Sequence, residues 1–158
     1  MENIEIKQLI EIDEDNLNKM TKWIYEWWGN SEAFTLEQVK VFLKNCMQKD
    51  RLPQTYGAFI GDSIIGMYQF TYEDLFVRPD IYPWLANVYV DEQYRGKGVC
   101  RKMLESVKGN AKQNTQVNEL WLYTKHINLY DKFGWEYVGN IDTCIEEQRS
   151  QRLYKLKL

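Results

Sequence analysis

The sequence has few of the residues from which metal centres and disulfide frameworks are built. It contains one histidine, His126, and three cysteines, Cys46, Cys100 and Cys144, which lie far apart and form no CxxC pair. This spacing favours neither a zinc cluster nor a disulfide framework, so we expect reduced cysteines and no metal site. Long apolar runs are also missing, and no stretch approaches the length of a membrane span.

The sequence also has fewer basic than acidic residues, 20 Lys and Arg against 23 Asp and Glu. The formal net charge of -3 at pH 7 argues against nucleic acid as the main partner, because phosphate backbones require concentrated positive charge. The first residues, MENIEIKQLIEIDEDN, are acidic where a secretory signal carries positive charge before an apolar core. We therefore expect a cytoplasmic protein that binds neither nucleic acid nor membrane and is a monomer or homodimer.

The chain length sets the number of domains. At 158 residues the chain can bury one sizeable core, but it is short for two domains. We therefore expect residues 1–158 to form a single domain.

Hydrophobic periodicity predicts strands and helices in mixed order. Apolar or alternating runs predict strands over residues 4–9, 55–61, 63–73, 84–90, 118–124, 135–142 and 152–158. Helical spacing predicts helices over 13–29, over 35–48, from about Lys97 into the 110s, and over 128–134. The expected core stripes of the first two helices are Leu17, Met20, Ile24 and Trp27, and Leu36, Val39, Phe42, Leu43 and Cys46. This order is typical of a mixed α/β protein of the α+β class, with helices around one sheet.

Local signals mark several element boundaries. Gly61 and Asp62 between two strand-like runs predict a hairpin. Thr35 followed by Gln38 is a capping-box pattern that predicts the start of the second helix. Gly29 is the predicted end of the first helix.

The stretch VDEQYRGKGVCRKML places Gly96 and Gly98 between an expected strand and an expected helix. Such a turn exposes backbone N–H groups at the positive end of the helix dipole, where a phosphate binds. On spacing alone, a plain tight turn explains the glycines equally well. Local charge favours the anion site, because residues 95–112 hold six basic residues and one acidic residue, Glu105. Neither a P-loop nor a dinucleotide fingerprint matches, since Cys100 and Arg101 stand where the latter requires its third glycine.

Two motifs carry a resemblance to a known family. QYRGKG, which follows an apolar strand, resembles the Gln/Arg-x-x-Gly-x-Gly/Ala signature of the GNAT superfamily of N-acetyltransferases. NLYDKFGWE resembles a second segment of that family at the expected distance downstream. The resemblance covers nearly the whole chain. It implies a central, mostly antiparallel, twisted sheet of about six or seven strands flanked by about four helices.

The resemblance also implies a cosubstrate, acetyl-CoA. Backbone amides of the glycine turn would wrap the pyrophosphate of coenzyme A, and the preceding strand would pair with its pantetheine arm. The implied cofactor-binding residues are Val88, Tyr89, Val90, Gln93, Arg95, Gly96, Lys97, Gly98, Val99, Cys100 and Arg101. Cys100 departs from the family pattern, which usually has glycine or alanine there; its thiol is either buried and inert or open to oxidation.

Acetyl transfer from a thioester to an amine requires a base for the amine and benefits from an acid for the departing thiolate. Tyr130 matches the tyrosine that the family uses as general acid; the alternative is a core aromatic residue. Glu73, Asp74 and Asp80, at the end of the third strand and in the loop that follows, are candidate bases and attractors of a cation, or else a solvated loop face. His126 has a side chain suited to proton transfer, although a structural role explains it as well.

The expected function is acetyl-CoA-dependent N-acetylation of a primary amine in a small, cationic molecule of aminoglycoside, polyamine or amino-acid type. One alternative is acetylation of protein N-termini or lysines, and another is a non-catalytic sensor of acyl-CoA. Aromatic residues of WIYEWW, residues 23–28, either pack in the core or hold the acceptor by cation–π contact. Core packing is the default prediction for Trp27.

Overall fold

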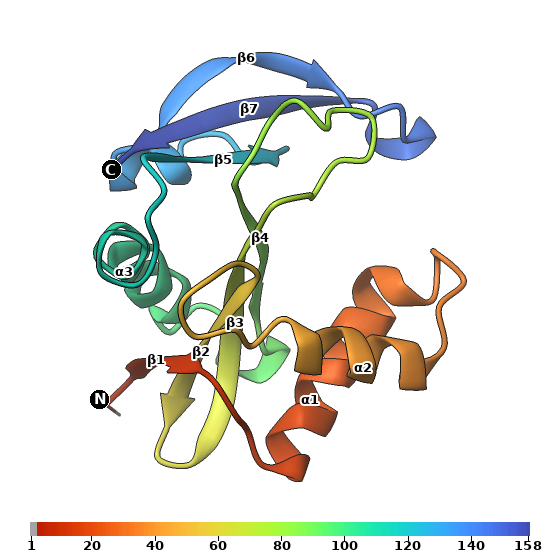
Figure 1. Cartoon of the computed structure of the whole chain (residues 1–158), viewed down its shortest axis with the longest axis vertical. Helices are drawn as coiled ribbons and strands as arrows, with labels where there is room; N and C mark the ends of the chain where they lie inside the picture. Colours follow the sequence, from red (N-terminus) through yellow and green to blue (C-terminus); the bar gives the residue numbers. More distant parts are fainter. Residues whose placement is uncertain (1–2) are drawn as a thin grey trace.

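A seven-stranded sheet forms the centre of the molecule in the computed structural model, which describes residues 3–158 (Figure 1). The strand order is β1-β2-β3-β4-β5-β7-β6, and within these residues only the β4–β5 pair is parallel. The strands are β1 (Glu5–Leu9), β2 (Gln54–Ile60), β3 (Ser63–Thr71), β4 (Trp84–Val90), β5 (Glu119–Thr124), β6 (Glu136–Asp142) and β7 (Ser150–Lys157). The predicted mostly antiparallel sheet of the α+β class is confirmed.

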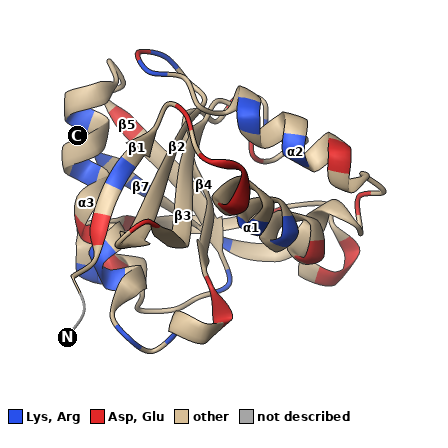
Figure 2. Ribbon diagram, turned by 90° about the horizontal axis from the view of Figure 1, so that it is seen from below, with Lys and Arg blue, Asp and Glu red and all other residues tan. Residues whose placement is uncertain are grey.

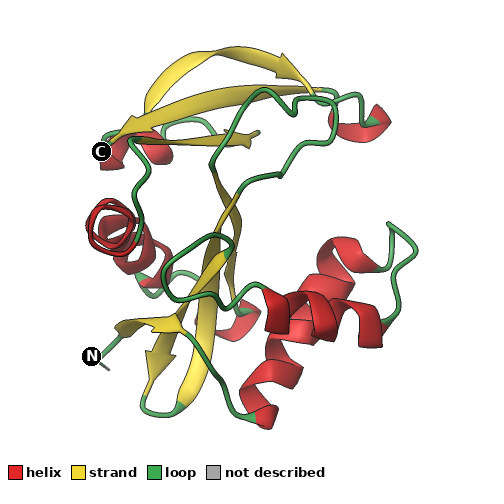
Figure 3. Cartoon of the chain, viewed as in Figure 1, coloured by secondary structure: helices red, strands yellow, loops and turns green. Residues whose placement is uncertain are grey.

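Helices cover both faces of the first half of the sheet (Figure 3). They are α1 (Glu14–Ile24), α2 (Leu36–Asn45) and α3 (Val99–Asn114). Ile64 and Met67 of β3 pack in one cluster with α1 and α2, whereas Ile65, Tyr68 and Phe70 pack in another with α3. A strand buried on both faces needs apolar residues at successive positions. This requirement explains the apolar run from Ile64 to Tyr68 in β3.

The described residues contain three α-helices, whereas about four were expected. The segment predicted as the fourth helix forms a four-residue 3-10 turn, Tyr130–Phe133. Asn128 and Gly134 on either side of it have positive φ angles of 63° and 88°. These left-handed residues leave too few positions between them for an α-helix.

Several boundary predictions are confirmed. The β2–β3 hairpin turns at Gly61 and Asp62, and Thr35 and Gln38 form the capping box of α2. The helical run that begins with α1 ends at Gly29, but its last turn, Tyr25–Gly29, is π-helical.

The predicted core stripes are wrong at three positions. Trp27 is 48% exposed, because the π-helical turn inserts an extra residue per turn and rotates the side chains that follow Ile24. Leu36 and Phe42 of α2 are also exposed, since α2 buries only its Val39 and Leu43 edge against α1.

Among the described residues, β4 and β5 pair at one position, the first residue of β4. Trp84 lies opposite Trp121, and the two strands then separate (Figure 1). β4 also contains a bulge, because Asn87 and Val88 together lie opposite Tyr68 of β3. Beyond Trp84, one edge of β4 therefore has no neighbour among the described strands, and this open edge positions the candidate site.

Candidate active site

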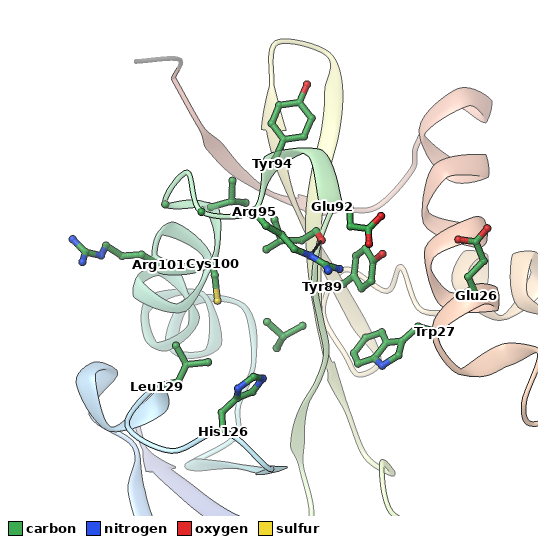
Figure 4. A pocket seen from close by; sticks show the side chains of 15 residues that line it. Glu26, Trp27, Tyr89, Glu92, Tyr94, Arg95, Cys100, Arg101, His126 and Leu129 are labelled. Carbon is green, nitrogen blue, oxygen red and sulfur yellow. Dashed lines mark hydrogen bonds between the residues drawn. The ribbon is translucent and has the colours of Figure 1, made fainter. Parts of the chain in front are cut away.

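A groove of about 770 Å³ runs along the open edge of β4 to the start of α3 (Figure 4). Most of the predicted cofactor residues line it, namely Val88, Tyr89, Val90, Arg95, Gly96, Gly98, Val99, Cys100 and Arg101. Gln93 and Lys97 are not among the lining residues. The structure therefore brings the strand and the glycine turn to one cavity.

The glycine turn has the backbone that the anion-site prediction requires. Gly96 and Gly98 have φ angles of 76° and 84°, which side chains disfavour. A Cβ at either position would meet no protein atom within 4 Å, so the backbone conformation, and not crowding, requires glycine. Gly98 caps the 16-residue helix α3 without a side-chain hydrogen bond, and the first N–H groups of the helix remain available to an anion. Arg95 and Arg101 line this end of the groove, and further Lys and Arg positions lie along α3 (Figure 2).

The backbone of Val90 faces the open edge. The N–H of Asp91 donates to the Ile65 carbonyl of β3 at 2.9 Å, so the preceding carbonyl, that of Val90, points the opposite way. This Val90 carbonyl accepts a hydrogen bond from Nε of Arg95 at 2.9 Å. The guanidinium of Arg95 thus occupies an edge position that an added strand-like ligand would use.

An aromatic stack forms the wall opposite α3. The ring of Tyr89 stacks on Trp23 at 5.3 Å between centroids and lies 5.6 Å from Trp27. Arg95 lies 5.2 Å above the same ring. Burial raises the pKa of the Tyr89 phenol, and the charge of Arg95 opposes that rise. Glu26, next to Trp27, adds a carboxylate to this wall (Figure 4).

Tyr130 lies just behind the groove, whose wall includes its neighbour Leu129. Its ring is 7% exposed and packs 6.1 Å from Trp135. Burial raises the pKa of the Tyr130 hydroxyl, and charge on Cys100 would raise it further. The hydroxyl therefore stays protonated at neutral pH and can act as a donor. Burial also raises the pKa of the Cys100 thiol, which makes this thiol less reactive.

Asp74 lies where β4 and β5 begin to separate. It follows β3, whose last residue Thr71 is opposite Trp84, and its backbone carbonyl accepts a hydrogen bond from the Tyr123 hydroxyl of β5 at 3.2 Å. Burial raises the pKa of the Asp74 carboxyl from 3.8 to about 7. A carboxylate with this pKa can accept and release a proton near neutral pH. It does not line the groove itself.

The other candidate bases differ from Asp74. Glu73 is exposed and does not line the groove. Asp80 forms a surface ion pair with Arg78, whose hydrogen bonds at 2.8 and 2.9 Å lower the pKa of Asp80. His126 is exposed and lines the groove on the side of Leu129 (Figure 4). Of the four candidates, Asp74 is therefore the one that combines a sheltered position with a pKa near neutrality.

Sequence reasoning does not identify four residues of the groove wall, Glu26, Glu92, Tyr94 and Leu129, and it offers Trp27 as an acceptor contact only as the alternative to core packing. Tyr94 lies inside the QYRGKG motif and Glu92 directly precedes it, so their proximity to the turn is a usable signal. Glu26 and Trp27 reach the groove through the π-helical turn, which the helical spacing does not reveal. Within residues 3–158, no three His, Cys, Asp or Glu side chains are arranged to hold a metal ion. None of the helices in this range has the length and the apolar sequence of a membrane span.

The chain is similar to known proteins in sequence and in fold. The model of the acetyltransferase (GNAT) family matches residues 17–135. Spermine/spermidine N(1)-acetyltransferase of Bacillus subtilis (strain 168) is 26% identical over 91 residues, which are 54% of this chain and 58% of that protein. The match thus spans less than two thirds of this curated relative.

Solved structures share the fold over the whole chain. A GNAT-family acetyltransferase from Streptococcus pneumoniae superimposes with a TM-score of 0.71 at 19% identity, covering 99% of this chain and 100% of that one. A GNAT-family acetyltransferase from Elizabethkingia anophelis with acetyl-CoA bound gives a TM-score of 0.62 at 17% identity and covers 100% of both chains. These TM-scores show a shared fold, and at identities below 25% they show the fold alone.

Proposed function

Because the chain belongs to the acetyltransferase (GNAT) family, we propose that it transfers the acetyl group of acetyl-CoA to a primary amine of a small, cationic molecule. The observation that carries this proposal is the groove in which a helix N-terminus without a side-chain cap, two positive-φ glycines and an unpaired strand edge meet. Together these features suit a ligand that has a pyrophosphate at one end and an amide-containing arm at the other.

Coenzyme A would lie along the groove from α3 to the base of the β4–β5 separation. Backbone N–H groups of residues 96–101 would hold the pyrophosphate, and Val88 and Val90 would pair with the pantetheine arm. Arg95 would have to release the Val90 carbonyl as the arm pairs there, and its freed guanidinium would lie close to the phosphates. Bound acetyl-CoA supplies an acyl group activated as a thioester.

Two side chains of this protein would move the protons. Asp74, with a pKa of about 7, would accept the proton that the ammonium group of the acceptor must lose before its nitrogen attacks the thioester carbonyl. Tyr130, whose pKa is raised by burial, would donate its proton to the thiolate as the carbon–sulfur bond breaks. The backbone N–H of Val88 would stabilise the oxyanion that forms between these two steps.

The acceptor is proposed to be a polyamine or a molecule of similar charge. Glu26 and Glu92 place carboxylates on the groove wall beside the aromatic rings of Trp27 and Tyr89, a combination that favours a cation. The match to a spermine/spermidine acetyltransferase supports the same class of amine. Aminoglycosides and amino-acid derivatives are the other acceptors to be tested.

A thiol-release assay with acetyl-CoA tests the proposal. The panel contains spermidine, spermine, an aminoglycoside, a free amino acid and a peptide with an unmodified N-terminus. We expect the fastest release with a polyamine. Turnover of the peptide alone would favour the protein-acetylating alternative, and tight acetyl-CoA binding without turnover of any amine would favour the acyl-CoA sensor.

A further inference from the structure

Asn87 has an unusual backbone conformation in the strand that borders the groove. Its φ angle is 52°, in the left-handed region that few residues other than glycine, asparagine and aspartate adopt. It forms the bulge of β4 together with Val88. The backbone torsions of Asn87 set the direction of the peptide group that carries the Val88 N–H, so whatever holds Asn87 also aims that N–H group.

The side chain of Asn87 is held at both ends. The indole Nε1 of Trp28 donates to its Oδ1 at 3.0 Å, and its Nδ2 donates to Oε1 of Gln69 at 2.7 Å. Because an indole N–H can only donate, the carbonyl end of the amide must face Trp28 and the amino end must face Gln69. The side-chain amides of Asn87 and Gln69 can therefore each adopt only one of their two flipped orientations.

The hydrogen bonds continue into the protein interior. Nε2 of the fully buried Gln69 donates to Oγ1 of Thr55 at 3.1 Å, and this hydroxyl donates to the Cys46 carbonyl at the end of α2 at 2.9 Å. The chain thus links the π-helical turn, the bulge of β4, two inner strands and α2. Buried polar groups keep their hydrogen-bonded positions, because a buried donor or acceptor without a partner costs free energy of folding.

We propose that the Trp28–Asn87–Gln69 chain positions the Val88 amide as the oxyanion donor and couples it to the turn that carries Glu26 and Trp27. This inference rests on the proposed acetyl transfer and adds to it two positioning residues, Trp28 and Asn87. Glu26, Trp27 and Trp28 belong to the same π-helical turn. An acceptor that contacts Glu26 or Trp27 would therefore bind to the turn from which Trp28 donates its hydrogen bond to Asn87. Binding of the correct amine and alignment of the oxyanion donor are then connected by hydrogen bonds.

The test compares Trp28→Phe and Asn87→Gly with wild-type protein. Phenylalanine keeps an aromatic ring near Phe34 and Phe42 but removes the N–H donor, while glycine tolerates the positive φ and removes both hydrogen bonds of the amide. We expect kcat for the best amine to fall about tenfold in Trp28→Phe, with the KM for acetyl-CoA unchanged, because deleting an oxyanion donor outright typically costs about a hundredfold or more. The double variant should be no slower than Asn87→Gly alone, since both changes break the same chain.

Tyr25→Phe is the matched control. It removes the hydrogen bond from the Tyr25 hydroxyl to Asn30 at 3.3 Å in the same turn, outside the chain to Asn87. Its kcat should stay at the wild-type value. The amide NMR resonance of Val88 should shift in Trp28→Phe and stay in place in Tyr25→Phe, which reports the position of the donor without any substrate.

Each outcome supports or overturns the positioning role. A folded Trp28→Phe protein with wild-type kcat and an unmoved Val88 resonance overturns the inference, and so does a loss confined to the KM for the amine, which would make Trp28 an acceptor contact. If Asn87→Gly fails to fold, Trp28→Phe still decides the question. Wild-type protein that turns over no amine refutes the proposed function, whereas wild-type turnover with an unaffected Trp28→Phe variant overturns only the positioning chain.

Discussion

Replacing Asp74 by asparagine should remove activity and add stability. Burial holds the pKa of Asp74 at about 7 instead of 3.8, so the folded protein keeps a proton that the unfolded chain loses. A carboxyl whose folded-state pKa is raised destabilises the fold as it ionises. This penalty is absent below about pH 4, grows between pH 4 and 7, and is complete above pH 7.

The size of the penalty follows from the shift. At about 1.36 kcal/mol for each pKa unit, a rise from 3.8 to about 7 corresponds to at most about 4 kcal/mol. Asp74 as a whole residue is half-buried, and its contact with water reduces that value, so we expect about 2 kcal/mol at pH 8. For a domain of this size, this difference raises Tm by about 4 to 8 °C. The Asp74→Asn variant, whose amide copies the protonated carboxyl, should show this gain at pH 8 and none at pH 4.

The assay combines two pH series. Calorimetric Tm values for wild type and Asp74→Asn are compared from pH 4 to pH 8, and kcat is measured at saturating amine, which removes the effect of amine ionisation in solution. Wild-type kcat should fall about tenfold between pH 8 and pH 6, following the fraction of ionised Asp74, and the variant should lack both the activity and this inflection. A Tm difference that does not change with pH, together with an unchanged rate profile in Asp74→Asn, would refute the reasoning; Glu73→Gln is the control, for which neither series should change.

Three further changes test other parts of the site. Gly98→Val should remove most of the acetyl-CoA affinity measured by calorimetry while the protein stays folded. Valine disfavours a φ of 84°, and its branched side chain would lie at the phosphate end of the groove. Unchanged affinity would exclude the turn as the binding site. Arg95→Met should weaken acetyl-CoA binding more at low salt than at high salt, because salt screens the contact between guanidinium and phosphate, and equal loss at both would contradict that contact. Tyr130→Phe should lower kcat about a hundredfold with KM unchanged, and the loss should shrink with a more acidic thiol leaving group; a wild-type kcat where chemistry limits the rate would make Tyr130 a core aromatic residue.

Local patterns were sufficient to predict most strands and the glycine turn. The alternation and apolar runs that define β2 to β5 depend on burial of each strand, and the positive φ of Gly96 and Gly98 depends on residue type at single positions. Both kinds of information lie within a few residues of sequence. The capping box of α2 is predictable for the same reason.

Features that depend on distant contacts were not predictable in this way. The exposed position of Trp27 follows from a π-helical turn, and the left-handed Asn87 depends on partners 59 and 18 residues away in the chain. The raised pKa of Asp74 arises from burial at the point where β4 and β5 separate, and the sequence near Asp74 contains no sign of it. Residue types therefore identified the candidates, while tertiary packing distinguishes Asp74 from Glu73 and Asp80.

Formation of the acetylated product tests the central claim most directly. Wild-type protein and Gly98→Val are incubated with acetyl-CoA and spermidine, and mass spectrometry measures acetylspermidine while a thiol reagent measures released coenzyme A. We predict that wild-type protein forms both products in equal amounts and that Gly98→Val forms neither above the uncatalysed rate at the same acetyl-CoA concentration. Thiol release without an acetylated amine, or equal product formation by the two proteins, would contradict acetyl transfer from a coenzyme A bound at the glycine turn.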